Sequence, residues 1–195
     1  MFLKTGTIIL ILLINLSGLS LFANDKRTAE ALGQKCKTEA AILAVPVGNF
    51  GADKDKKDFE AATKAVKMGQ VLLAQTKFRD AKAKFDEYQA LQYAIYESLA
   101  KKYLERTQVV QDEVGVDLAD HIENQEVVKY LKLAAQNLFD AKTSYSRKHY
   151  NHVVNQCRTA KSYAFAAYKL VGMKTPAKYQ RDLDDNEKKI SNSSK

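Results

Sequence analysis

Side chains that could carry catalysis are few and far apart in this sequence. Among the 195 residues there are three histidines and two cysteines. His149 and His152 stand three residues apart, so a helix would bring them to one face, yet no further metal ligand follows at a suitable spacing. The acids at Asp184 and Asp185 have no evident catalytic partner, and the patterns of serine hydrolases, phosphate-binding loops and zinc proteases are absent. We therefore predict that the protein is not an enzyme and holds no metal ion and no cofactor.

The first 23 residues differ in kind from the rest of the chain. Lys4 is their only charged residue, and the run from Thr7 to Leu16 is apolar except for Thr7 and Asn15. This pattern predicts a secretory signal peptide that is cleaved near residues 20–23. The alternative is an uncleaved anchor, because the segment approaches the ~20 residues that a membrane-spanning helix needs. We expect the mature protein to be exported, to the periplasm or to the cell exterior.

Export changes how the two cysteines are interpreted. Oxidising compartments let disulfides persist, so Cys36 and Cys157 could be bonded to each other. A bond between them would close a loop of about 120 residues, for which chain-entropy estimates give about 4–5 kcal/mol of stabilisation. The alternative is two separate buried thiols that act as small apolar residues. Both alternatives stay open at this point.

Composition and charge limit the classes of partner. Hydrophobic residues make up 46% of the chain and charged residues 28%, which is typical of a folded protein. The formal net charge is +8, and removal of the leader lowers it by one. The lysines are interleaved with acids, as on solvated helix faces. We expect no nucleic-acid partner for an exported protein, while peripheral contact with an anionic envelope surface stays open.

Apolar residues recur at steps of three and four along most of the mature chain, which predicts an all-α fold. We expect antiparallel helical hairpins in one domain over residues 24–175, followed by a charged C-terminal helix and tail over 176–195. Pro46 should end the first helix, Gly115 should break the chain after a long third helix, and Asn124 or Asp117 should cap the fourth. The expected helices cover residues 25–45, 55–75, about 78–111, about 124–147 and 150–171, and Pro176 begins the last.

One helical hairpin carries a recognisable packing pattern. Gly69 is followed by Ala81 and Phe85 on the next helix, and Leu72 and Phe78 flank the turn between them. The residues from 65 to 88 resemble a tetratricopeptide repeat, whose two helices carry a Leu-Gly pair, an aromatic residue, and then Ala and Phe four residues apart. Ala65 departs from the large residue of that family, and no proline follows the second helix. The resemblance implies close antiparallel packing at Gly69 and Ala81.

A fainter copy of this hairpin lies 72 residues further on, over residues 137–160. Ala141 takes the place of Gly69, and Tyr150 takes the place of Phe78. On the second helix of the copy, Val153, Cys157 and Ala160 stand where Ala81, Phe85 and Tyr88 stand in the first. A generic helical bundle would use small residues for the same reason, so that alternative is kept.

Tyrosine is the most informative residue type for a binding function. The chain has ten Tyr, and the long third helix is apolar over an arc wider than one neighbouring helix can cover. Tyrosine suits partner surfaces because it buries a large apolar body and keeps a polar tip. The residues predicted to face a partner are Gln70, Tyr93, Tyr96, Lys142 and Tyr145.

These observations predict a non-enzymatic interaction or scaffolding protein of the cell envelope, which binds a protein partner through the surfaces of its hairpins. Self-association is compatible with the same surfaces. One alternative is a component of a periplasmic assembly, similar in architecture to the helical proteins that coat periplasmic flagella. Another is a carrier of a lipid or small ligand, which would need a cavity between the helices.

Overall fold

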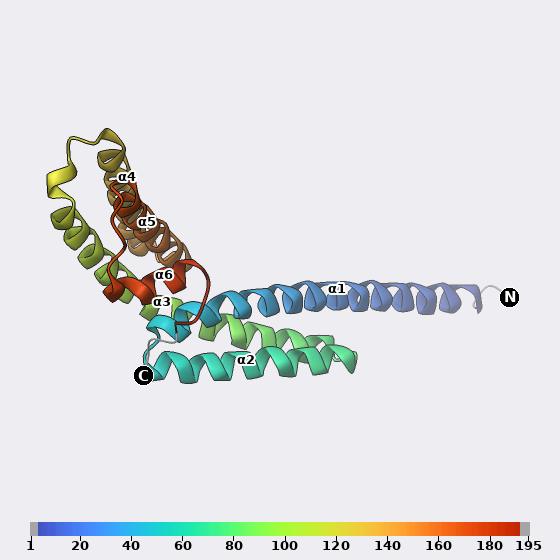
Figure 1. Cartoon of the computed structure of the whole chain (residues 1–195). Helices are drawn as coiled ribbons and strands as arrows, with labels where there is room; N and C mark the ends of the chain where they lie inside the picture. The colour runs from blue at the N-terminus through green and yellow to red at the C-terminus, as the bar shows by residue number, and fades with distance from the viewer. Residues whose placement is uncertain (1–3, 192–195) are drawn as a thin grey trace. The chain divides into compact units, whose positions relative to one another are not determined.

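The computed structural model describes residues 4–191, with side chains from Asp25 onward. This part of the chain is all α and contains no strand, which confirms the predicted fold class (Figure 1). The order of elements is α1 (Lys4–Phe50), α2 (Asp53–Ala74), α3 (Phe78–Asp117), the 3-10 turn η1 (Ala119–His121), α4 (Gln125–Ser146), α5 (Tyr150–Leu170), the 3-10 turn η2 (Ala177–Tyr179) and α6 (Gln180–Asn186).

The described chain divides into two compact units, and α1, α2 and α3 each contribute residues to both. Unit 1 comprises the described residues up to Ala40 together with Ala61–Ala90, and unit 2 comprises Ala41–Glu60 together with the described residues from Leu91. Residues 24–175, predicted as a single domain, are therefore divided between two units. The predicted C-terminal segment belongs to unit 2.

The predicted signal peptide over residues 1–23 falls outside the residues whose side chains are described. The backbone from Lys4 onward is helical and continuous with the rest of α1. Among the residues whose side chains the structure describes, no helix has a stretch both long and apolar enough to cross a bilayer.

Helix α1 runs through Pro46 and ends four residues later, at Phe50, so the predicted end at Pro46 is wrong. Proline removes one backbone hydrogen bond from a helix interior. Here Leu43 and Val47, on either side of Pro46, belong to a buried cluster of unit 2, and this packing offsets the loss. The chain turns instead at Gly51, and the Ala52 N–H donates to Asp55 Oδ2 at 2.7 Å at the start of α2.

Helix α3 likewise runs through the predicted break at Gly115 and ends at Asp117. Val110, Val114 and Leu118 follow one stripe and are fully buried in a second cluster of unit 2. Gly115 lies off this stripe at an open position, where an added Cβ would meet nothing within 4 Å. The core stripe therefore keeps the helix intact despite the low helix propensity of glycine. Beyond the turn, Asn124 caps α4 as predicted, accepting from Glu126 N–H at 3.0 Å.

In unit 1, a single aromatic ring fills the space between three helices. Phe85 of α3 is fully buried, and it lies against Gly69 of α2 and Gly33 of α1. A Cβ at Gly69 would come within 2.4 Å of the ring, and a Cβ at Gly33 within 2.7 Å. Ala81 is also fully buried, whereas Leu72 and Phe78 are only partly so. The glycines let the helices approach closely enough to enclose the ring.

The turns of the two hairpins are the same in backbone detail. Thr76 in the α2–α3 turn has a φ of 58°, and Lys148 in the α4–α5 turn has a φ of 60°. In each turn the left-handed residue donates to the carbonyl three residues back, and its successor donates to the carbonyl five residues back, which is the Schellman arrangement. The partners, namely Leu73 and Leu72 in the first turn and Tyr145 and Ser144 in the second, are again 72 residues apart.

The second hairpin belongs to unit 2 and is filled by smaller groups. Ala141, Val153, Cys157 and Ala160 are fully buried, and Tyr150 is 6% exposed. The pair Ala141 and Cys157 thus occupies the positions held by Gly69 and Phe85 in the first hairpin. A larger residue on the first helix accompanies a smaller one on the second, so the two copies fill similar spaces differently.

Candidate functional site

Neither histidines nor cysteines form a reactive centre. His149 and His152 lie with their rings 5.8 Å apart, and the described residues contain no group of three or more His, Cys, Asp or Glu that could hold a metal ion. Both cysteines are free buried thiols. The structure therefore has two separate thiols and no disulfide between Cys36 and Cys157. The Cys36 thiol donates to the Phe85 carbonyl oxygen at 3.9 Å in unit 1, whereas Cys157 lies in a core cluster of unit 2. Burial raises the pKa of each thiol to about 11.

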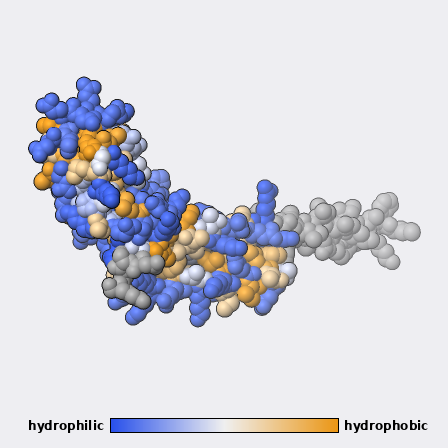
Figure 2. Space-filling view, in the orientation of Figure 1, coloured by the Kyte–Doolittle hydropathy of each residue, from blue (hydrophilic) through white to orange (hydrophobic). Residues whose placement is uncertain are grey.

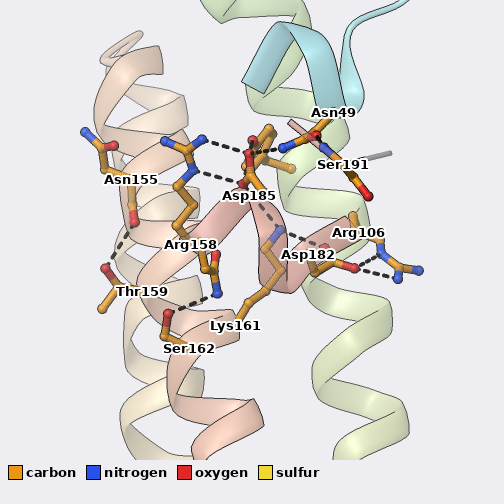
Figure 3. A network of polar contacts seen from close by, with 12 residues as sticks. Asn49, Arg106, Asn155, Arg158, Thr159, Lys161, Ser162, Asp182, Asp185 and Ser191 are labelled. Carbon is orange, nitrogen blue, oxygen red and sulfur yellow. Dashed lines mark hydrogen bonds and ion pairs between the residues drawn. The ribbon is translucent and has the colours of Figure 1, made fainter. Parts of the chain in front are cut away.

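Unit 2 contains a buried ionic network that the sequence analysis missed (Figure 3). Asp182 of α6 and Lys161 of α5 are both fully buried. Lys161 Nζ donates to Asp182 Oδ1 at 2.8 Å, and Arg106 of α3 donates to Asp182 Oδ2 from Nε at 3.0 Å and from Nη2 at 2.7 Å. One carboxylate therefore joins three helices.

The second carboxylate of the network is Asp185, one turn further along α6. Arg158 of α5 binds it with two parallel hydrogen bonds, of 2.9 Å from Nε and 2.7 Å from Nη2, and the Tyr103 hydroxyl donates to it at 2.8 Å. Burial alone would raise the pKa of Asp185, but the Arg158 hydrogen bonds and the charge of Lys161 hold it below its ordinary value. Asp185 is therefore ionised at neutral pH.

Aromatic rings complete the surroundings of the buried ammonium group. Lys161 Nζ lies 4.8 Å from the centre of the Phe50 ring and 4.9 Å from that of the Tyr103 ring. A cation over a ring face is attracted by the ring quadrupole, and this attraction is stronger away from water. Burial of a charge is costly unless it is paired and hydrogen-bonded, and both conditions are met here.

The network also fixes the end of the described chain. Asn49 of α1 donates from Nδ2 to the Lys189 carbonyl oxygen at 2.8 Å and accepts from the Ser191 N–H at 2.7 Å. Ser191, in the predicted C-terminal tail, is buried, whereas residues 192–195 lie outside the described residues. Both carboxylate oxygens of Asp182 and both of Asp185 accept hydrogen bonds. We interpret the network as a structural feature that holds α6 against α3 and α5, and not as a catalytic site.

An open groove of about 640 Å³ lies beside this network, between α3 and the segment that contains η2 and α6. Its walls include several cations, of which Lys102 is bound to Asp55 at 2.8 Å and Lys178 to Glu113 at 3.0 Å. Because these cations are already paired with carboxylates, the groove offers little uncompensated charge to an anionic ligand.

The residues predicted to face a partner are brought together only in part. The rings of Tyr93 and Tyr145 each pack edge-on against Tyr150, with centroids 5.3 and 5.5 Å apart. Tyr150 in turn donates to Glu97 at 2.8 Å, which raises the pKa of its hydroxyl. Tyr93 is 49% exposed, whereas Tyr96 packs partly buried against the core. The two remaining residues lie elsewhere, with Lys142 bound to Gln108 at 2.8 Å and Gln70 in unit 1.

The clearest unpartnered surface is the outer face of α4. Its inner face is buried through Val127, Ala134, Leu138 and Ala141. The outer face nevertheless carries further apolar residues, with Ile122 just before the helix 65% exposed and Phe139 near its end 64% exposed. In unit 2, apolar surface is visible around the connection from α3 to α4 (Figure 2). The outer face of α4 is defined here as Ile122, Gln125, Val128, Lys129, Lys132, Leu133, Gln136 and Phe139.

Most of this face lines a second open groove of about 610 Å³, from Ile122 to Gln136. The groove is lined by apolar residues, namely Ile122, Val128 and Leu133, together with Lys129 and Lys132. This face was not among the partner surfaces predicted from the sequence. The signal for a second face was present, because Val128, Leu133 and Phe139 fall off the Val127, Leu131, Leu138 stripe.

No protein-family model, no curated protein and no solved structure matches this chain. The tetratricopeptide resemblance therefore rests on the residues and turns of the two hairpins.

Proposed function

We propose that the protein is an exported, non-enzymatic interaction or scaffolding protein of the cell envelope, which binds a protein partner on the outer face of α4. The observation that carries this proposal is a helix whose core-facing side is already buried and whose outer side still presents large apolar groups. Large exposed apolar groups that line one groove mark interaction sites more often than singly scattered ones do.

The first hairpin provides an internal reference for this face. The two hairpins are offset by 72 residues, so each outer position of α4 has a counterpart in α2. The counterparts of Val128, Leu133 and Phe139 are Lys56, Ala61 and Lys67, and these three α2 residues are exposed. These outer positions are thus basic or small in the first hairpin and large and apolar in the second. Because the first hairpin carries lysine at two of these positions and alanine at the third, the large apolar residues of α4 are not required by the hairpin itself.

Site-specific photo-crosslinking in the native envelope tests this proposal. A photoreactive phenylalanine analogue at position 139 or 133 should capture a defined partner, while the analogue at the corresponding positions 67 and 61 of α2 should not. Capture at position 139 should also be lost when Leu133→Lys is added, because a charge in the apolar face repels the partner's apolar surface. Equal capture at positions 139 and 67, or none at either, would contradict binding through α4.

The export part of the proposal has its own test. Mass analysis of the protein recovered from the envelope fraction should show a new N-terminus near residues 21–24. An intact N-terminus on membrane-bound protein would favour the anchored alternative instead, and protein recovered only from the cytoplasm would contradict export.

A further inference from the structure

A second exposed stripe lies on α3 of the same unit. Val109 is 46% exposed and Val116 is 76% exposed, and the acids Glu105 and Asp112 alternate with them at steps of four, three and four residues. These four residues are called the outer face of α3. A different stripe of α3, formed by Val110, Val114 and Leu118, packs into the core. Val116 in particular exposes an apolar side chain without any role in the buried cluster.

The outer faces of α3 and α4 are complementary in charge. The α4 face carries Lys129 and Lys132, of which Lys129 also pairs with the exposed Glu126 at 3.3 Å along the helix. The α3 face carries Glu105 and Asp112, of which Asp112 also accepts from Gln108 Nε2 at 2.9 Å. On both faces, charged residues are interspersed with apolar ones. The α3 face runs over twelve residues, or about 17 Å, and fits within the helical part of the α4 face, which spans about 21 Å from Gln125 to Phe139. Opposite charges interspersed with apolar groups set both attraction and register in helix pairing.

One chain can present both faces at the same time. Contacts between α3 and α4 within the chain use other residues: Gln111 Nε2 donates to the Ala134 carbonyl oxygen at 2.6 Å, and Lys142 Nζ donates to Gln108 Oε1 at 2.8 Å. A surface that binds a different, complementary surface on an identical molecule gives a heterologous contact, which adds copies head to tail.

We infer that the occupant of the α4 outer face is the α3 outer face of a second copy, so that the protein assembles head to tail. This inference rests on the proposed function, because it takes the outer face of α4 as a binding surface and names its partner. The scaffolding role then follows from repetition of one contact between identical chains.

Charge reversal provides a sharp test on the full mature chain. The variant K129E/K132E reverses the α4 face, and the variant E105K/D112K reverses the α3 face. Sedimentation velocity over a wide concentration range should show concentration-dependent growth for the wild type, weaker at high salt. Each variant alone should associate at least about tenfold more weakly, because like charges would then face each other.

Two further samples should restore assembly. In an equal mixture of the two variants, every contact between unlike chains pairs opposite charges, so growth should return. The quadruple variant K129E/K132E/E105K/D112K should also assemble by itself. All altered side chains are exposed, and circular dichroism of each variant checks that the helices are intact.

The outcomes separate this inference from the proposed function. A wild type that stays monomeric at every concentration overturns head-to-tail assembly, while crosslinking from position 139 to a different protein would still support binding through α4. Assembly of the wild type that neither variant weakens, or weakening that neither mixing nor the quadruple variant restores, overturns the pairing of these two faces. Crosslinking that fails at position 139 while the wild type assembles contradicts the proposed function itself.

Discussion

The two hairpins share a turn and differ in what they present to their surroundings. Thr76 and Lys148 adopt the same left-handed conformation with the same hydrogen bonds, 72 residues apart. Inside, one hairpin encloses Phe85 beside glycines, and the other pairs Ala141 with Cys157. Outside, α2 carries Lys56, Ala61 and Lys67 at the positions where α4 carries Val128, Leu133 and Phe139. The comparison teaches that backbone geometry and interior volume are constrained together, while the outer face is free to acquire a binding role.

The largest difference between the two units is the buried ionic network of unit 2. The variant Asp182→Ala tests how much this network contributes to the free energy of unfolding. The change leaves the fully buried Lys161 with only a distant carboxylate, Asp185 at 3.9 Å. Breaking a buried pair in this way should lower the free energy of unfolding by about 3–5 kcal/mol. Urea titration followed by circular dichroism measures the loss.

The matched control is Asp86→Ala in unit 1, which removes the exposed pair of Lys82 and Asp86. It should change the free energy of unfolding by no more than about 0.5 kcal/mol. A similar loss in both variants would show that the network contributes no more than an ordinary surface pair.

The interior of the first hairpin is tested next by Gly69→Ala. The new Cβ would meet the Phe85 ring at 2.4 Å, so the helices must separate or the ring must move. We expect a loss of about 1–3 kcal/mol in the free energy of unfolding. Gly115→Ala introduces the same methyl group into open space and should instead stabilise α3 by roughly 0.5–1 kcal/mol. Thermal unfolding of the two variants should give shifts of opposite sign, and a gain at both positions would refute close packing at Gly69.

The smallest effect concerns the shared turn. Glycine adopts a positive φ without steric cost, so Thr76→Gly and Lys148→Gly should each raise the free energy of unfolding by up to about 1 kcal/mol. The gain should be larger at Thr76, because a β-branched residue is the more strained there. Thermal melts of the two variants check the order, and destabilisation by both would contradict the expected relief of strain at the left-handed residues.

The sequence was sufficient for the helices and for the repeat, because periodic apolar positions and small residues act locally. It was not sufficient at Pro46 and Gly115, where burial of neighbouring side chains outweighs the local preference for a break. The ionic network was missed for a different reason: Asp182 and Asp185 resemble any exposed acid, and their partners lie far away in sequence. The one available signal was Lys161, a charge on an α5 stripe that is otherwise apolar from Cys157 to Tyr168.

The two unbonded thiols give this molecule a reporter in each half. Cys36 lies in the core of unit 1 and Cys157 in that of unit 2, and a pKa of about 11 keeps each thiol protonated and slow to react at neutral pH. Reaction with a thiol reagent therefore requires that the surrounding helices first move apart. The rates of alkylation at the two positions would measure how often each half opens, and thus which half yields first, without any engineered label.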